Sequence, residues 1–257
     1  MVQPKKHLGQ HFLTDPAIAE RIVSAMTPAN DRVVIEIGPG KGVLTRFLLQ
    51  EDLRRFIPIE IDGESYDYLL REWPQLQEEL LLRDFLKIDV ASLGEERLQI
   101  IGNFPYNISS QIFFKVLENK NIVSEVVCMI QKEVADRLVS PPGSKAYGIL
   151  SVFLQAFYKL EYLFTVKPGS FFPPPKVKSG VIKLIRNETS QLDCNEKLFF
   201  QVVKTSFNQR RKTIRNSLKT ILLNLHVESE LLSKRPEQLS VTEFIELTNL
   251  IDNNRKE

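Results

Sequence analysis

The chain has 257 residues, of which 43% are hydrophobic and 26% charged, and its formal net charge is +2. This composition excludes an intrinsically disordered chain, and the length suits one ordinary domain with a smaller one attached. No apolar run reaches the about 20 residues of a membrane-spanning helix, and we expect no signal peptide. Two cysteines, Cys128 and Cys194, are too few for a disulfide framework, so we expect a cytoplasmic protein.

Strand and helix patterns alternate from residue 33 onward. Asp15 followed by Pro16 predicts the start of an earlier helix. Short apolar runs predict five strands, at residues 33–37, 56–61, 80–84, 98–102 and 126–130. Helical patterns follow the first strand, at residues 43–50, and the fifth, at residues 147–157. Strands that alternate with helices indicate a parallel sheet covered on both faces.

The pattern changes after the fifth strand. Two strand-like runs, 160–166 and 180–186, are joined by a proline-rich segment, so we expect an antiparallel pair at the sheet edge. Pro58 inside the second strand predicts a bulge or an unpaired side. Beyond Asn187 the apolar residues recur at helical spacing. The predicted fold is therefore α/β: a mostly parallel, Rossmann-like sheet in residues 1–186, then a small all-α domain in residues 187–257.

The first strand leads into a loop with glycine at positions 38, 40 and 42. A dinucleotide fingerprint requires a further glycine where Val43 stands, so the loop suits a ligand without phosphates. Glu60 ends the second strand, where a carboxylate can accept both hydroxyls of a ribose, and Asp84 ends the third, where it can accept from an adenine amine. Each feature alone also fits a turn or a solvated strand end. Together they predict a nucleoside site at the carboxyl edge of the sheet.

Asn103-Phe104-Pro105-Tyr106-Asn107 follows the fourth strand at the same edge. The exocyclic amine of adenine is a poor nucleophile, because its lone pair is delocalised into the ring. The side-chain oxygen of Asn103 and the carbonyl of Pro105 can each accept one N–H and so direct this lone pair toward a methyl donor. Tyr106 offers a stacking face, and Phe171 is the candidate for the opposite face. The alternatives are a proline turn with core aromatics and, for Phe171, simple packing. A target adenine must leave its stack to reach such a pocket.

Residues 208–219 hold five cations and no acid. Such a run is either a solvated helix face or a site for phosphate contacts.

With these residues in view, the sequence resembles the bacterial small-subunit ribosomal RNA adenine N6,N6-dimethyltransferases over almost its whole length. The resemblance is carried by residues 7–13, 38–42, 103–107, 131–134, 145–148, 171–177 and 207–213. It implies a class I methyltransferase fold, S-adenosylmethionine as methyl donor and no metal. It also implies dimethylation of two adjacent adenosines in a hairpin near the 3′ end of 16S rRNA, within the immature small subunit.

The resemblance also assigns residues. It implies donor contacts at His11, Leu13, Gly38, Gly40, Glu60, Asp84 and Asn103. It places Asn103, Pro105 and Tyr106 on the target-amine motif and Phe171 on the stacking aromatic. It implies phosphate contacts for Arg210, Arg211, Lys212 and Arg215.

One departure is His11, where the family often has asparagine. Histidine can still donate to the donor's carboxylate, but its protonation then matters. His7 and His11 have no third ligand nearby in the sequence, so we expect no metal site. As a separate expectation, we take the protein to be a monomer.

The sequence also allows two other functions. One is a relative of the macrolide-resistance type, which methylates large-subunit RNA. Residues 131–134 and the long basic segment favour the small-subunit branch instead. The other is a non-catalytic ribosome assembly factor, against which the intact 103–106 motif argues.

Overall fold

The computed structural model describes residues 2–28, 31–93, 97–223 and 225–255. By its internal contacts the chain divides into two compact units, the first of residues 1–135 and 160–186 and the second of residues 136–159 and 187–257. Sequence reasoning placed residues 136–159 in the sheet domain, whereas these contacts place them with the C-terminal helices. The reason is helix α6 (Ile149–Phe157), whose Phe153 ring lies 4.5 Å from that of Phe200.

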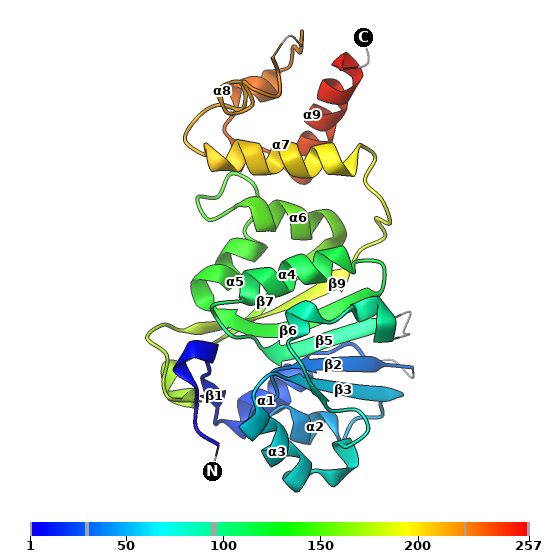
Figure 1. Ribbon diagram of the computed structural model, residues 1–257. Coiled ribbons are helices and arrows are strands. Elements are labelled where there is room, and N and C mark those ends of the chain that lie inside the picture. The colour runs from blue at the N-terminus through cyan, green and yellow to red at the C-terminus, as the bar shows by residue number, and fades with distance from the viewer. Residues whose placement is uncertain (1, 29–30, 94–96, 224, 256–257) are drawn as a thin grey trace. The chain divides into compact units, whose positions relative to one another are not determined.

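Within the described residues, the first unit contains a seven-stranded sheet of order β4-β3-β2-β5-β6-β9-β7 (Figure 1). The five strands from β4 to β6 in this order run parallel to one another, and β9 is antiparallel to β6. The sheet is thus mostly parallel with an antiparallel strand toward one edge, as predicted. The strands are β2 Val33–Ile37, β3 Arg55–Glu60, β4 Leu81–Leu82, β5 Leu98–Asn103, β6 Val123–Gln131, β7 Tyr158–Val166 and β9 Ser179–Arg186.

Pro58 lies in β3 opposite Glu36 of β2, without a break in the register of these two strands. On its other side, β3 pairs with β4 only through Ile59 and Glu60. The missing N–H of Pro58 therefore faces no strand, which confirms the unpaired side rather than the bulge. Strand β4 is two residues long, shorter than the predicted 80–84, because the chain leaves the sheet at its edge.

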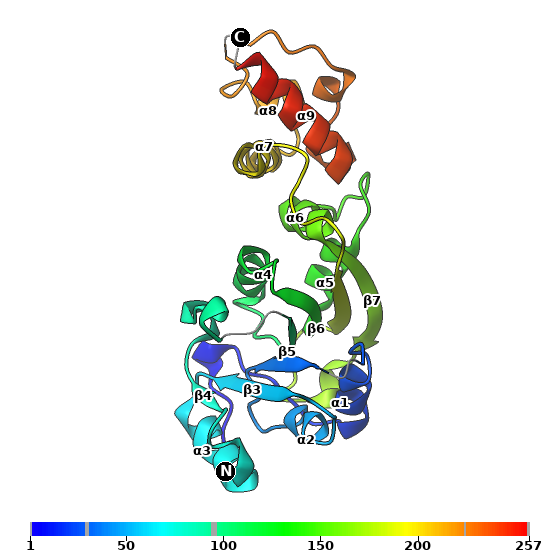
Figure 2. The same cartoon turned by 90° about the vertical axis from the view of Figure 1, so that its right-hand side faces the viewer.

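Helices cover both faces of this sheet, with α1 and α2 on one face and α4 on the other (Figure 2). Helix α1 begins at Pro16 because the Asp15 carboxylate accepts from the N–H groups of Ala17 and Ile18, as predicted. Within the described ranges, no helix is long and apolar enough to cross a membrane. The helices of this unit are α1 Pro16–Val23, α2 Thr45–Leu48, α3 Gly63–Glu72, α4 Ser109–Glu118 and the first residues of α5 Lys132–Val139, with 3-10 turns η1 Lys6–Leu8, η2 Pro74–Leu76, η3 Phe85–Lys87, η4 Val90–Leu93 and η5 Pro168–Ser170.

The first unit also contains a short antiparallel ribbon of two strands, each two residues long. Strand β1 (Phe12–Leu13) pairs antiparallel with β8 (Phe171–Phe172), and the register sets Phe12 opposite Phe172 and Leu13 opposite Phe171. Leu13 and Phe171 join the hydrophobic core that packs against α1 and the sheet. Each large apolar side chain buried in this way contributes about 1.5–3 kcal/mol, so the ribbon is firmly attached.

The second unit consists of helices, as predicted for its C-terminal part. Its core includes Phe207, whose ring lies 6.2 Å from that of Tyr147 and 6.0 Å from that of Phe244. Helix α9 starts with a capping box between Ser240 and Glu243. The elements of this unit are α6, α7 Glu196–Asn208, α8 Ile214–Ser217, η6 Glu230–Ser233, η7 Pro236–Gln238 and α9 Val241–Asn254.

Candidate active site

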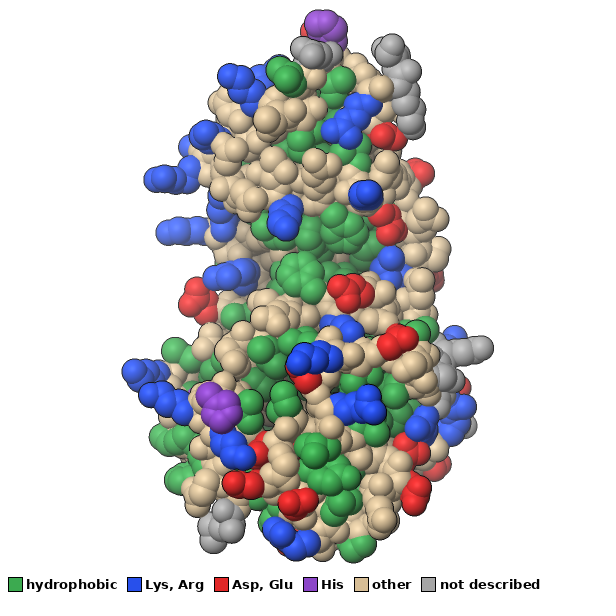
Figure 3. All heavy atoms as spheres, viewed as in Figure 1, with side chains coloured by type: hydrophobic (Ala, Val, Ile, Leu, Met, Phe, Trp, Pro, Cys, Tyr) green, Lys and Arg blue, Asp and Glu red, His purple; other side chains and the backbone are tan. Residues whose placement is uncertain are grey.

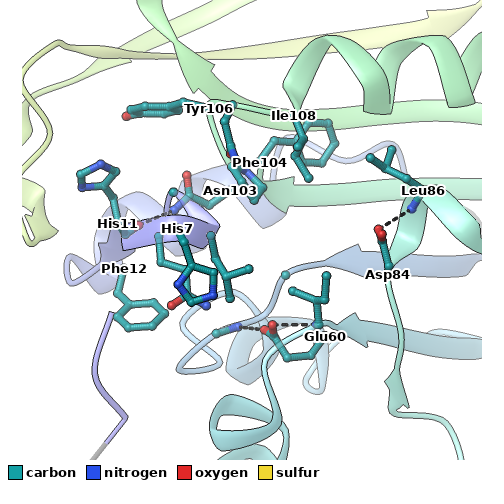
Figure 4. Close-up of a pocket in the computed structure, with 18 residues that line it drawn as sticks. His7, His11, Phe12, Glu60, Asp84, Leu86, Asn103, Phe104, Tyr106 and Ile108 are labelled. Carbon is teal, nitrogen blue, oxygen red and sulfur yellow. Dashed lines mark hydrogen bonds between the residues drawn. The ribbon is translucent and has the colours of Figure 1, made fainter. Parts of the chain in front are cut away.

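A cavity opens at the carboxyl ends of β2, β3 and β5, where a parallel sheet binds its ligands (Figure 4). Its empty volume is about 820 Å³, a figure that includes space open to solvent. The N-terminal segment supplies one wall, and the strand ends supply the rest. The lining residues are His7, Leu8, Gly9, Gln10, His11, Phe12, Gly38, Gly40, Glu60, Ile61, Asp84, Leu86, Asn103, Phe104, Pro105, Tyr106, Asn107 and Ile108.

The cavity brings together most of the predicted site residues, but not Leu13 or Phe171. Leu13 lines only a smaller cavity next to it, and Phe171 lines neither. Both side chains are 4% exposed in the core. The cause is the alternation of side chains along the β1–β8 ribbon, which turns Leu13 and Phe171 inward and leaves the other face to Phe12 and Phe172. In this structure the Phe171 ring is buried in the core, and its role as the second face of the base pocket stays a prediction.

Asn103 is fixed at the end of β5. The preceding Gly102 lets β5 approach β2 closely, since a Cβ at that position would lie 2.6 Å from the carbonyl oxygen of Ile37. The Asn103 side chain donates from Nδ2 to the carbonyl oxygen of His11 at 2.8 Å (Figure 4). Because this bond holds the amide nitrogen, the side-chain oxygen is left as an acceptor. The sequence predicted this acceptor role, and the structure supplies the contact that orients it.

Pro105 and Tyr106 follow in the next turn. The Pro105 carbonyl accepts one bond, from the N–H of Ile108 at 3.2 Å, so one of its two lone pairs is left. The Tyr106 hydroxyl lies 2.7 Å from Oγ of the buried Ser179. Burial raises the pKa of the Tyr106 phenol, so the ring stays neutral. Tyr106 is therefore a fixed, uncharged aromatic face beside two acceptor oxygens.

His11 lies close to this ring. Its Nδ1 is 2.7 Å from the carbonyl oxygen of Pro173, and its ring centroid is 5.5 Å from that of Tyr106. A carbonyl can only accept, so Nδ1 carries the hydrogen, and Nε2 of the neutral ring is an acceptor. Neutral His11 therefore has no N–H left to donate from Nε2, and the predicted donation to a ligand carboxylate through that atom requires the cationic form.

The glycine loop and Glu60 lie in the middle of the cavity. Gly38 has a φ of 65°, and a Cβ there would meet no atom within 4 Å, so the backbone is open to a ligand. Glu60 is 2% exposed, and burial raises the pKa of its carboxyl. It accepts from the N–H groups of Gly40, Ile61 and Asp62, each at 2.9 Å. Three of about four acceptor positions are thus used, which leaves room for one hydroxyl rather than the predicted two.

Asp84 lies at the far end of the cavity from Asn103 (Figure 4). Its Oδ1 accepts from the N–H of Leu86 at 3.0 Å and starts helix η3, while Lys87 Nζ lies 3.9 Å from Oδ2. Asp84, Glu60 and Asn103 are therefore spaced along one elongated pocket, in the order expected for a base, a ribose and a reactive end.

Glu36 is a buried acid that was not among the predicted site residues. This acid is 1% exposed in the middle of β2, and its Oε2 accepts from Thr45 Oγ1 at 2.7 Å. Burial raises the pKa of Glu36 to about 8. It lines the smaller cavity together with Gly38 and Asn103. A lone acid inside an apolar strand, in Val33-Val34-Ile35-Glu36-Ile37, was the available signal.

The basic segment of the second unit separates into two kinds of residue. Arg210 Nη2 donates to the carbonyl of Lys145 at 2.6 Å, and its Nε lies 3.8 Å from the carboxylate of Glu237. Arg210 therefore holds the chain near residue 145, and its predicted phosphate contact competes with these bonds. Arg211, Lys212 and Arg215 are exposed. Figure 3 shows cationic side chains gathered over the end of α7 and over α8.

Comparisons with known proteins identify the family of this chain. The model of the ribosomal RNA adenine dimethylase family matches residues 1–252. The chain belongs to this family. Among similar relatives, the ribosomal RNA small subunit methyltransferase A of Bacteroides thetaiotaomicron is 54% identical over 255 residues, covering 98% of this chain and 95% of that one. The protein of the same name from Cytophaga hutchinsonii is 53% identical over 252 residues, covering 97% and 98%.

Solved structures of other dimethylases and methyltransferases share the fold. A dimethyladenosine transferase from Plasmodium falciparum has a TM-score of 0.79 at 27% identity and covers 96% of this chain and 98% of its own. The 23S rRNA methyltransferase ErmE has a TM-score of 0.67 at 24% identity, covering 92% and 99%, which shows a common fold only. The predicted class I methyltransferase fold is thereby confirmed, and the chain is an enzyme of the adenine dimethylase family.

Proposed function

We propose that this enzyme transfers methyl groups from S-adenosylmethionine to the N6 amines of two adjacent adenosines in a hairpin near the 3′ end of 16S rRNA. The reaction takes place on the immature small subunit in the cytoplasm. The single observation that carries the proposal is the orientation of Asn103, whose amide nitrogen is bound to His11 so that its oxygen faces the cavity as an acceptor.

The pocket fits the donor. Asp84 can accept from the adenine amine at one end, and Glu60 can accept one ribose hydroxyl through Oε2. Gly38 lets the backbone approach the methionine part. When bound, the donor supplies an electrophilic methyl group on a cationic sulfur. A cation bound nearby would lower the pKa values that burial has raised at Glu36 and Glu60, and so favour the ionised carboxylates.

The chain's own residues position the target amine. Asn103 Oδ1 and the free lone pair of the Pro105 carbonyl each accept one N–H, which turns the nitrogen lone pair toward the methyl carbon. Tyr106 holds the base by stacking, because Ser179 fixes its hydroxyl. Such alignment supplies much of the rate gain without a strong base. Once the nitrogen carries the new methyl group it is cationic, and it loses its proton to water.

The exposed cations of the second unit bind the RNA. Arg211, Lys212 and Arg215 are available for phosphate contacts, which position a nucleic acid without reading its sequence. Arg210 supports them by anchoring the neighbouring chain.

The decisive experiment combines purified protein, labelled donor and small ribosomal subunits from cells that lack this gene. Mass spectrometry of the RNA should find dimethyladenosine at two adjacent positions near the 3′ end of 16S rRNA. Label in 23S rRNA alone would support the macrolide-resistance type of activity. Tight binding to subunits without any label, at every assembly stage tested, would support the non-catalytic assembly factor and refute the proposal.

A further inference from the structure

Phe172 places a half-exposed aromatic ring beside the cavity. Its side chain is 51% exposed, although its neighbour Phe171 is buried. The β1–β8 register sets Phe172 opposite Phe12, which lines the cavity. Three consecutive prolines follow Phe172 and restrict the backbone. The backbone that carries the exposed ring is therefore restricted, so little backbone entropy is lost when a ligand contacts the ring.

Lys41 brings a cation to the same place. Its Nζ lies 5.2 Å from the ring centroid of Phe12 and 5.9 Å from that of Phe172. Within the described part of the chain, no carboxylate pairs with this ammonium group, in contrast to Lys5, which pairs with Asp62. Lys41 also follows Gly40 in the loop that lines the cavity. An ammonium group stacked on aromatic rings and without an anion is suited to accept one.

The surrounding segment carries only positive charge. Residues 162–187 contain five cations and no acid. Lys176 and Lys178 are exposed close after Phe172, on either side of Val177, which is 45% exposed. Exposed aromatic and apolar groups interleaved with cations are typical of surfaces that bind single-stranded nucleic acid.

We propose that Phe172 and Lys41 bind the nucleotide next to the target adenosine, with its base stacked on the Phe172 ring and its phosphate paired with the Lys41 ammonium. The inference rests on the proposed function, because it assumes that the cavity takes up an RNA base. A target base that enters the cavity leaves its neighbour outside it, and Phe172 and Lys41 both lie next to Phe12, which lines the cavity. Stacking on an aromatic ring accepts any base, so this contact positions the strand without selecting its sequence.

The test compares Phe172→Ala and Lys41→Gln with the wild-type enzyme on small subunits from cells that lack the gene. For Phe172→Ala we expect KM for subunits to rise about tenfold, as for loss of one stacked base, while kcat stays within about twofold. Phe172→Tyr should restore KM because it keeps the ring. Phe114→Ala removes another exposed phenylalanine, 43% exposed on α4, and should leave KM unchanged.

For Lys41→Gln we expect a weaker salt dependence. The slope of log affinity against log salt should fall in magnitude by about 0.7, the value for one phosphate contact on a single strand. Affinity for S-adenosylhomocysteine, measured by calorimetry, should match the wild type in Phe172→Ala, which separates RNA contacts from damage to the donor site. Melting temperatures check that each variant is folded.

The outcomes distinguish this inference from the proposed function. If the wild type methylates subunits and both variants behave like Phe114→Ala, the inference is overturned and the proposed function stands. If the wild type binds subunits but transfers no methyl group, the proposed function fails, and the affinities of the same variants for subunits then decide whether Phe172 and Lys41 contact RNA.

Discussion

Replacing Asn103 with aspartate tests the orientation of the target-amine site. Aspartate keeps an acceptor oxygen of the same size, so it would preserve activity if an oxygen at this position were sufficient. The structure indicates otherwise, because Asn103 Nδ2 donates to the His11 carbonyl at 2.8 Å. A carboxylate in this place has no hydrogen to donate, so one of its oxygens would face the carbonyl oxygen. The side chain must then rotate or take up a proton, and the aligned acceptor is lost.

The expected size of the effect follows from the two bonds involved. Loss of one preorganised hydrogen-bonding group at a reacting centre costs about 2.7–4 kcal/mol, or about 10²–10³-fold in kcat. Loss of the bond to His11 costs roughly 1 kcal/mol of stability. In a chain of this length that corresponds to a fall of roughly 2–4 °C in Tm. Asn103→Asp should therefore lose nearly as much kcat as Asn103→Ala.

The assay is single-turnover methyl transfer to subunits at saturating donor, with Tm measured in parallel. Binding to subunits serves as the control, since neither variant alters the basic surface of the second unit. A misaligned site should retain only about a hundredth of the wild-type rate or less. If Asn103→Asp keeps more than about a tenth of that rate, the bond to His11 does not orient the acceptor.

Three further predictions concern other side chains. Folding raises the pKa of Glu36 from 4.5 to about 8, so between these pH values Glu36 ionises in the unfolded chain but not in the folded one, and the stability of the wild type falls as pH increases. The Tm of Glu36→Gln relative to the wild type should therefore rise from about pH 5 to about 8 and then level off. A difference in Tm that does not change with pH would contradict this prediction. Tyr106→Phe should keep the stacking face and most of kcat. Its stability should fall by about 1 kcal/mol, because the hydrogen bond to Ser179 is lost. A large fall in kcat would instead show that the hydroxyl takes part in the reaction. Arg210→Ala should lower Tm, because the bond to the Lys145 carbonyl is lost. Arg211→Ala should instead weaken subunit binding and reduce its salt dependence, because Arg211 is exposed. Equal effects of the two variants on binding would show that Arg210 and Arg211 do not differ in role.

Much of the sheet could be predicted from the sequence because buried parallel strands are apolar along their whole length. Residues 33–37 were predicted as a strand and form β2 with the same limits. The division into domains was predicted less well. Helix α6 lies between the sheet strands β6 and β7 in the sequence, and only its contacts with the later helices show to which unit it belongs. Such contacts are not encoded in local periodicity.

The part of the site that is formed by the ends of the strands could be predicted from the sequence. Gly38, Glu60, Asp84 and Asn103 all lie at the carboxyl edge, where the topology of a parallel sheet gathers them. The burial of Phe171 was left open by the sequence, because which side of a two-residue strand faces inward depends on its partner, β1. The single hydroxyl available at Glu60 and the tautomer of His11 depend on backbone groups from distant parts of the chain. A sequence pattern does not specify those.

The wall formed by the N-terminal segment has a consequence for the order of synthesis. Residues 7–12 are the first of the site to leave the ribosome, yet their attachment through β1 requires β8, about 160 residues later in the chain. Contacts between such distant segments form slowly and late. A nascent chain ending before residue 170 can assemble the central strands but not the closed pocket. The newly made enzyme should therefore acquire its donor only after nearly the whole sheet unit has been translated, so that donor binding marks the completed folding of that unit.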